Sequence, residues 1–349
     1  MSAPLVLVTG ATGHIGFGVL ARLLKDGYQV RVASRRQTAV EKLLQLPSIK
    51  PYASSVSFIE VSDFLAEHAF DEAVNGVDYI IHVASPIPDP AHGEKDFSVR
   101  THYIEPAVQG NVGLLKAASL SPSVKRVVIT SSVAILRRAP EGESTKVGPD
   151  DLAPLLETSE WEDTKSVHTA YAESKKQAND AAEKFIAQQT PHFDVVHILP
   201  GFVQGRNETV TSVEDLRELR VSSNTVMVKY VLGAKDGPLA PTNLVLLDDV
   251  AAAHVAALSP KNATSGERFI VTYPEEIPWN TIDPIVKKLF PAEVESGLLP
   301  LGETLSGYYV PYDVSKSTEK LGVQFRGPED MVKSLVGQLV ELKHAEAKN

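Results

Sequence analysis

The chain has 349 residues, enough to bury one large core and to carry a smaller second lobe. Its 34 Lys and Arg residues against 44 Asp and Glu residues give a net charge of −10, which argues against a broad basic surface and against nucleic acid as a partner. The absence of cysteine excludes disulfides, thiolate metal sites and thiol redox chemistry, and it suits a reducing compartment.

Neither a signal peptide nor a membrane segment is predicted. An apolar run begins at Leu5, which leaves no room for the charged and hydrophobic regions of a signal peptide, and no later apolar run approaches about 18 residues. We therefore expect a soluble, cytoplasmic protein without membrane contact. The sequence leaves open whether it is a monomer or a homodimer.

A glycine-rich motif follows the first apolar run, at residues 9–16, and opens an amphipathic stretch from Phe17 to Asp26. Glycines at a strand-to-helix turn let the backbone approach a pyrophosphate, while the helix N-terminus supplies a positive field. This context predicts a dinucleotide site. The motif residues expected to contact the cofactor are Thr9, Gly10, Gly13, His14, Ile15 and Gly16.

The second predicted strand, residues 29–34, ends in Arg35 and Arg36, and no acid stands where one would bind the ribose 2′-hydroxyl of NAD. A 2′-phosphate favours guanidinium groups, which bind it through paired hydrogen bonds. The sequence therefore predicts NADP(H), with Arg35 as first choice and Arg36 and Lys42 behind it. The alternative is that the two arginines are simply solvated on a loop.

Short β-branched runs alternate with helical patterns up to about residue 200, which is typical of βαβ units and a parallel sheet. The run at 78–83 is nearly all apolar, as expected for a strand covered on both faces, so the predicted fold class is α/β with a doubly wound parallel sheet. The strand candidates are residues 5–9, 29–34, 56–61, 78–83, 126–131 and 194–199, and the main helices between them are 106–120 and 171–189.

Asp63 and Phe64 come just after the third predicted strand and could bracket an adenine ring, although an N-capping role for Asp63 fits nearly as well. Two irregular segments, 86–97 and 137–168, fall beyond the carboxyl ends of strands, where a doubly wound sheet keeps its ligands. Each is a candidate for the substrate rim. Ordinary surface insertions explain both segments equally well.

Tyr171 and Lys175 lie four residues apart in the long helical stretch, which places a phenol and an ammonium group on one face. A phenol beside a fixed cation can donate a proton near neutral pH. After Pro200 and Gly201 the pattern becomes mixed. We expect a dinucleotide-binding domain at 1–200 and, at 201–349, a substrate lobe with some elements returning to the first domain. Asp248 or Asp249 is expected to cap a helix at 249–257.

With the glycine motif, the Tyr171–Lys175 pair and the Thr-Ser-Ser run at 130–132, the chain resembles the extended short-chain dehydrogenase/reductase family over almost its whole length. It is most similar to the branch of dihydroflavonol reductases, cinnamoyl-CoA reductases and fungal carbonyl or methylglyoxal reductases. The other stretches that carry the resemblance are residues 82–86, 106–110, 124–132, 157–161 and 249–254.

This resemblance implies a Rossmann-type sheet with a smaller, mixed C-terminal substrate lobe, and it implies roles for three catalytic residues. Tyr171 would protonate a carbonyl oxygen as hydride arrives from the nicotinamide, and Lys175 would bind the nicotinamide ribose and lower the tyrosine pKa. Ser132 would hydrogen-bond the substrate oxygen, with Ser131 as the fallback. Asn111 is not assigned to a proton relay. Further cofactor contacts are expected from Val83, Ala84, Ser85, Pro200 and Val203.

The substrate pocket is poorly specified, and its wall residues are proposed by position alone. They are mostly apolar, which suits a neutral or aromatic ketone or aldehyde. His82, His168 and His254 lack metal-ligand spacing, so no metal is expected. Two competing functions are an NAD-dependent nucleotide-sugar epimerase or dehydratase and a non-catalytic NADP-binding redox sensor. The proposed wall residues are Ser85, Ile87, Val133, Phe202, Gln204 and Tyr230.

Overall fold

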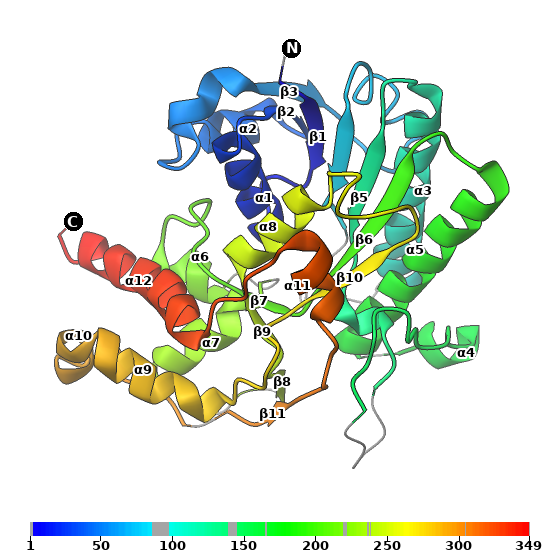
Figure 1. Cartoon of the computed structure of the whole chain (residues 1–349). Coiled ribbons are helices and arrows are strands. Elements are labelled where there is room, and N and C mark those ends of the chain that lie inside the picture. The colour runs from blue at the N-terminus through cyan, green and yellow to red at the C-terminus, as the bar shows by residue number, and fades with distance from the viewer. Residues whose placement is uncertain are drawn as a thin grey trace.

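The computed structural model describes residues 3–85, 98–138, 145–164, 166–218, 222–235, 237, 239–303 and 305–348. Its centre is a parallel sheet of seven strands in the order β10-β6-β5-β4-β1-β2-β3 (Figure 1). The order reverses between β1 and β4, which makes this the doubly wound sheet that the sequence predicted. The strands are β1 (Leu5–Thr9), β2 (Gln29–Ser34), β3 (Val56–Glu60), β4 (Tyr79–His82), β5 (Arg126–Thr130), β6 (Asp194–Pro200) and β10 (Arg268–Val271).

Helices cover both faces of this sheet, as the nearly continuous apolar strands indicated. In β1, Val6 and Val8 enter the core beneath α1 (His14–Lys25) and α8 (Leu247–Ala256), whereas Leu7 enters the core beneath α3 (Glu105–Leu120) and α5 (Val167–Gln189). Figure 1 shows these two helix pairs on opposite sides of the strands. The alternation therefore buries every side chain of the strand interior.

The six predicted strands are confirmed to within one or two residues, but the seventh was not predicted. β10 is four residues long and follows an irregular stretch, and it pairs with β6 in the register Arg268↔His197. The shorter elements that flank the sheet are α2 (Gln37–Leu43), the 3-10 turns at Lys50–Ser55 and Val133–Ile135, the π-helical turn at Arg100–Ile104, and α4 (Thr158–Trp161).

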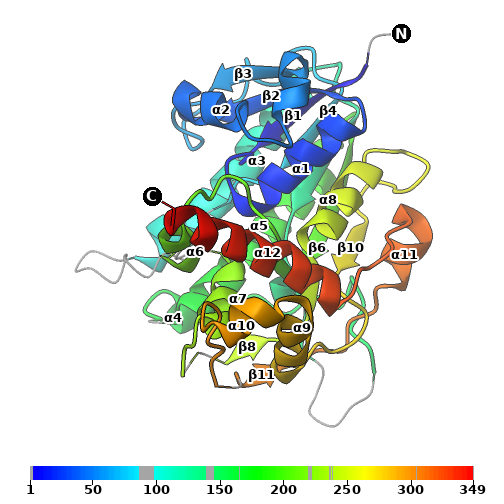
Figure 2. The same ribbon diagram turned by 90° about the vertical axis from the view of Figure 1, so that its left-hand side faces the viewer.

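The C-terminal lobe packs around its own apolar core, which includes Tyr230, Trp279 and Leu335. Figure 2 shows α12 lying across this lobe, while α11 lies apart from it, beside β10. The lobe elements are α6 (Val213–Glu218), α7 (Asn224–Val231), α9 (Ile282–Leu289), α10 (Pro291–Glu295), α12 (Pro328–Glu346), a 3-10 turn at Trp279–Thr281, and the strand pairs β7 (Phe202–Gln204) with β9 (Leu244–Leu246) and β8 (Ala240–Pro241) with β11 (Gly307–Tyr308).

The predicted capping of α8 is wrong. This helix begins at Leu247 and its N-cap is Leu246, so Asp248 and Asp249 lie inside the first turn. The buried carboxylate of Asp249 instead accepts hydrogen bonds from the backbone N–H and the guanidinium of Arg326, which follows α11 (Ser315–Leu321). A partner 77 residues away in the sequence therefore decides where this carboxylate points.

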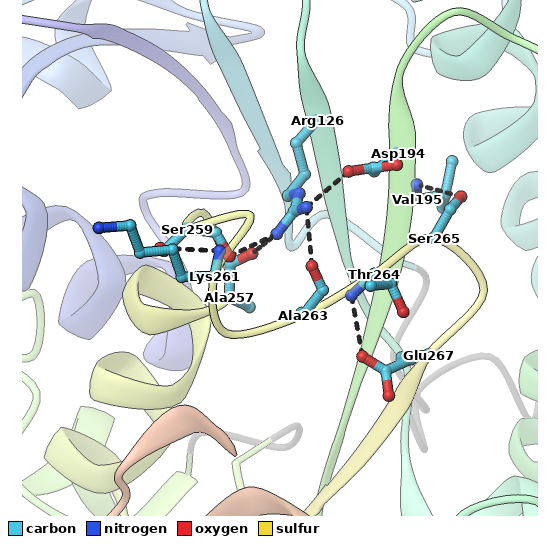
Figure 3. A network of polar contacts seen from close by, with 10 residues as sticks. All are labelled: Arg126, Asp194, Val195, Ala257, Ser259, Lys261, Ala263, Thr264, Ser265 and Glu267. Atoms are coloured by element: carbon cyan, nitrogen blue, oxygen red, sulfur yellow. Dashed lines mark hydrogen bonds and ion pairs between the residues drawn. The ribbon is translucent and has the colours of Figure 1, made fainter.

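Arg126 ties the loop after α8 to the sheet (Figure 3). Its guanidinium, which is buried, donates to the carbonyls of Ala257, Ser259 and Ala263 and lies 2.5 Å from Asp194 Oδ2. A buried guanidinium is stable only when its N–H groups find hydrogen-bond acceptors. Here this one side chain reaches four acceptors, the three loop carbonyls and the Asp194 carboxylate. The loop that leads into β10 is held by this contact.

We predict that Arg126→Met lowers the free energy of unfolding by about 3 kcal/mol, because it leaves three loop carbonyls without their donor. Urea unfolding followed by circular dichroism measures the change. Arg22→Met is the matched control, since the half-exposed Arg22 pairs with Asp26, four residues away, and such pairs contribute less than about 1 kcal/mol. Equal stability of the two variants would contradict the assignment.

Candidate active site

The glycine motif forms a cradle at the carboxyl end of β1. Gly10 has φ +73°, a conformation that favours glycine, and a Cβ there would meet the Ala84 backbone nitrogen at 2.7 Å. A Cβ on Gly16 would meet the Gly10 carbonyl oxygen at 2.0 Å. A Cβ on Gly13, in contrast, would meet nothing closer than 3.4 Å. Gly10 and Gly16 are therefore needed for packing, whereas Gly13 keeps open the space in front of the helix N-terminus.

Thr9 joins the ends of β1 and β4, where the strand order reverses. Its Oγ1 lies 2.8 Å from Nδ1 of the buried His82 and accepts a hydrogen bond from the Ala84 N–H. The Val83 N–H donates to the Thr9 carbonyl at 3.3 Å. Residues 83–85 thus lie beside the glycine cradle, as the cofactor prediction requires.

His14, the first residue of α1, lies near the Val203 backbone. Burial lowers the pKa of His14 to about 4, and the nearby Val203 backbone opposes this only in part, so the imidazole is neutral at pH 7. Ile15 packs against the main core and Pro200 ends β6. The structure therefore brings the glycine motif together with the Pro200–Val203 turn that the sequence placed at the nicotinamide.

Arg35 and Arg36 follow β2 and are exposed, as is Lys42 on α2. The Ser34 hydroxyl donates to the Arg36 carbonyl at 3.3 Å, which fixes the backbone of the turn rather than the guanidinium. In the part of the chain that the structure describes, none of these three cations forms an ion pair. Their charges remain available to an anion.

Asp63 and Phe64 follow β3 in a turn rather than a helix. Asp63 Oδ1 accepts a hydrogen bond from the Leu65 N–H at 2.8 Å, so its carboxylate stabilises the turn. The Phe64 ring packs edge-on against Phe70 with 5.1 Å between ring centroids. Their role at the adenine stays a prediction.

Ser132, Tyr171 and Lys175 meet at the carboxyl end of β5. Ser132 begins the 3-10 turn that follows the strand, and its Oγ accepts a hydrogen bond from the Ala134 N–H at 3.1 Å. Lys175 Nζ donates to the Thr130 carbonyl at 3.3 Å and lies 5.9 Å from the centroid of the Tyr171 ring. Ser132 is also near enough to Tyr171 to act on the pKa of its phenol, whereas Ser131 faces a small cavity behind Lys175. Of the two serines, Ser132 is therefore the one beside the phenol.

Burial controls the charges of this trio. It raises the pKa of Tyr171, and the neighbouring Ser132 hydroxyl opposes the shift only in part. It lowers the pKa of Lys175 to about 8. The expected lowering of the tyrosine pKa by Lys175 is not found in the protein alone. Removing the phenolate from water destabilises it by more than the neighbouring polar groups stabilise it. At pH 7 the phenol carries its proton and the ammonium is mostly charged.

A buried ion pair beside Tyr171 was missed at the sequence level. Lys176 Nζ lies 2.6 Å from Glu173 Oε2 and donates to the Pro154 carbonyl at 2.7 Å. Glu173 accepts from the Leu156 N–H at 3.3 Å. The pair therefore fastens part of the 145–164 segment to α5, and the predicted irregular segment is held rather than loose. The signal in the sequence was that Lys176 directly follows Lys175, so that both lysines stand beside the buried face of α5.

The proposed wall residues separate into two groups. Ser85, Val133 and Phe202 are partly buried near the site, with the Phe202 ring edge-on to Trp279 at 6.5 Å. Gln204 is fully buried, and its Nε2 donates to the carbonyls of Val203 and Ser223. Tyr230 lies in the lobe core and hydrogen-bonds Asp283. Neither of the last two side chains faces an open pocket, and Ile87 lies outside the described residues.

The three histidines that lack metal-ligand spacing in the sequence have separate surroundings. His82 bonds Thr9, His254 bonds Thr130 at 2.8 Å, and His168 is exposed. Within the described residues, no group of three or more His, Asp or Glu side chains could hold a metal ion. No described helix has both the length and the apolar character that crossing a membrane requires.

The family model described as the NAD-dependent epimerase/dehydratase family matches residues 6–271. The chain belongs to this family. It is the extended short-chain dehydrogenase/reductase group that the motifs indicated, and the match runs from β1 to β10. The family therefore accounts for the central sheet, the glycine cradle and the Tyr171–Lys175 helix together.

Curated relatives cover nearly the whole chain. Ketoreductase CTB6 of Cercospora nicotianae is 36% identical over 358 residues, with 98% of this chain and 96% of that protein covered. Ketoreductase sphI of Aspergillus fumigatus is 31% identical, with 98% and 99% covered. The solved structure of Gre2 from Candida albicans in complex with NADPH has a TM-score of 0.78 at 24% identity, covering 97% of this chain and 99% of that one. At that identity the likeness shows the fold.

We predict that Gly13→Val abolishes dinucleotide binding while the protein stays folded, because the new side chain fills the space in front of α1 and meets little of the protein. Fluorescence titration with NADPH, together with thermal unfolding, measures both effects. Gly16→Val is the matched contrast, since its Cβ collides with the Gly10 carbonyl and should unfold the protein. Native affinity in Gly13→Val would show that the cofactor lies elsewhere.

Proposed function

We propose that this protein is an NADPH-dependent reductase of a largely apolar ketone or aldehyde of small or medium size. The observation that carries the proposal is the meeting of Ser132, Tyr171 and Lys175 at the strand ends beside the glycine cradle. Two relatives that match the chain end to end are named ketoreductases, which supports the same reaction class.

The chemistry follows from the charge states of these side chains. When bound, the nicotinamide supplies hydride to the carbonyl carbon. The neutral phenol of Tyr171 gives its proton to the carbonyl oxygen, so the C=O π bond breaks as C–H and O–H bonds form. Ser132 donates a hydrogen bond to the oxygen as negative charge develops on it, and Lys175 stabilises the phenolate left on Tyr171. The alcohol and the oxidised cofactor are the products.

The choice of NADP(H) rests on residues 34–36. A serine and two exposed arginines end β2, where NAD-specific sites place an acid for the ribose 2′-hydroxyl. The same absence argues against an NAD-dependent sugar epimerase, although the family name includes that activity. The intact Tyr171–Lys175 pair argues against a sensor that binds cofactor without chemistry. Residence in the cytoplasm and a monomer or homodimer state remain predictions.

The wall of the site supports an apolar substrate. Val133 follows the catalytic serine, and Phe202 packs against Trp279 at the start of the lobe. These groups bind a hydrocarbon or aryl surface better than a charged one. The physiological carbonyl compound would be found within that class.

We predict that Tyr171→Phe lowers turnover at least about 100-fold while NADPH still binds, because the ring stays and only the proton donor is lost. NADPH oxidation followed by absorbance, with aryl ketones, α-keto esters, dicarbonyls and a dihydroflavonol as substrates, measures the loss. Tyr52→Phe is the matched control, because Tyr52 is exposed and distant in sequence from Tyr171. Turnover of these substrates by Tyr171→Phe at the native rate would refute the mechanism.

We predict that Arg35→Ala weakens NADPH binding about 10-fold to 100-fold and leaves NADH binding unchanged, because only NADPH carries the 2′-phosphate. Titration of both cofactors into both proteins measures the difference. Arg22→Ala removes a half-exposed arginine elsewhere and controls for net charge. If the native protein prefers NADH, or if Arg35→Ala weakens both cofactors equally, the phosphate assignment fails.

A further inference from the structure

Helix α5 carries a stripe of four polar side chains that extends the catalytic pair inward. Tyr171, Lys175, Asn179 and Glu183 follow one another at intervals of four residues, so they lie on one face of the helix. Lys175 and Asn179 are buried, whereas the Glu183 side chain is 34% exposed. The stripe therefore leads from the catalytic phenol through the protein to its surface.

A small polar cavity lies behind Lys175. Its volume is about 10 Å³, close to what a single water molecule needs. Asn179 Oδ1 is buried without a hydrogen-bond partner among the described residues, which makes it a natural acceptor for such a water. The polar residues that line the cavity are Ser85, Asn111, Thr130, Ser131, Lys175, Asn179 and His197.

His197 connects this cavity to Glu183. It lies on β6 and is fully buried, its ring lines the cavity, and its Nε2 is 3.4 Å from Glu183 Oε1. A neutral imidazole carries a donor at one ring nitrogen and an acceptor at the other, so it can take up a proton on one side and release one on the other. The neighbouring His197, followed by the charge of Arg268, holds the pKa of Glu183 below its usual range.

Charged and ionisable side chains from neighbouring strands lie beside this route from Lys175 to Glu183. Arg268 on β10 lies 2.8 Å from Glu183 Oε1 and 2.8 Å from Asp150 Oδ1. His82 on β4 lies near Lys175, and burial with that charge lowers its pKa to about 3, so it stays neutral. The titratable groups that face the route are therefore Lys175, His197 and Glu183, with Arg268 as a fixed cation.

A second, larger cavity is also lined by Asn179. It has a volume of about 220 Å³, and both Asn179 and Glu183 line it together with Lys176 and Leu152. Asn179 thus borders both the small cavity and the larger one. Asp180 also lies at this opening, but its carboxylate pairs with Lys184 at 2.8 Å.

We propose that His197 and Glu183 form the route by which the proton spent by Tyr171 is replaced from solvent. After each reduction Lys175 returns a proton to the phenolate, a water in the small cavity reprotonates Lys175, His197 supplies that water, and Glu183 passes a solvent proton to His197. The sum is one proton taken from solvent for each hydride delivered. This inference rests on the proposed function, and His197 and Glu183 act through Lys175 rather than on the substrate.

The test separates the first turnover from those that follow. In Glu183→Gln, rapid mixing with NADPH and a reducible ketone should show one equivalent of NADPH oxidised at the native rate, because Tyr171 begins protonated. Steady turnover should then be about 10-fold slower, with a larger solvent isotope effect than in the native enzyme. Imidazole buffer, which carries protons at neutral pH, should restore steady turnover in proportion to its concentration.

A second variant and a matched control protect the test from a folding artefact. His197→Gln keeps a hydrogen-bonding group but cannot take up and release a proton, so it should give the same fast first turnover and slow steady state. Asp180→Asn removes a carboxylate at the same opening and should turn over like the native enzyme. The route is refuted if Glu183→Gln and His197→Gln match the native steady rate, if the first turnover falls equally without buffer rescue, or if Asp180→Asn is slowed as much. Native turnover by Tyr171→Phe would instead refute the proposed function.

Discussion

The hydrogen bond from Lys175 Nζ to the Thr130 carbonyl fixes the site, because it joins the helix that carries the phenol to the strand that leads into the serine. Thr130 ends β5, Ser132 follows two residues later, and Tyr171 lies one helical turn before Lys175. The Lys175–Thr130 hydrogen bond thus fixes the side chains of Ser132, Tyr171 and Lys175 relative to one another. The buried Glu173–Lys176 pair adds a second attachment to the segment before α5. Such a frame would hold the proposed proton donor in place before any substrate arrives.

Two threonine–histidine pairs at the strand ends give this frame its rigidity. Thr9 of β1 bonds His82, and Thr130 of β5 bonds His254, whose Nδ1 lies 2.8 Å from the Val250 carbonyl. A ring nitrogen facing a carbonyl must carry hydrogen, so Nε2 of His254 accepts from the Thr130 hydroxyl. Burial lowers the pKa of His82 to about 3 and that of His254 to about 4. Both rings are uncharged around pH 7, so these strand ends keep one protonation state while Lys175 titrates nearby.

The parts that the sequence predicted well are those with a local physical signature. Apolar runs and the spacing of the glycines between them predict β1, β2 and α1. Helical periodicity predicts that Tyr171 and Lys175 lie on one face of α5. The parts it missed depend on distant partners. β10 is a short apolar run recognisable only beside β6, Asp249 turns toward Arg326, and Tyr230 is drawn into the lobe core by Asp283. No local pattern encodes where such partners will lie.

The order of the elements also constrains how the molecule can be divided. After Pro200 the chain enters the lobe through β7, returns to the sheet with α8 and β10, leaves again for α9 and α10, returns with α11 and ends in the lobe with α12. Cutting the chain at residue 200 would not yield two complete folding units. The sheet would lose its edge strand β10 and the covering helix α8. Exchanging the lobe between relatives would therefore require several simultaneous crossovers in the chain rather than one.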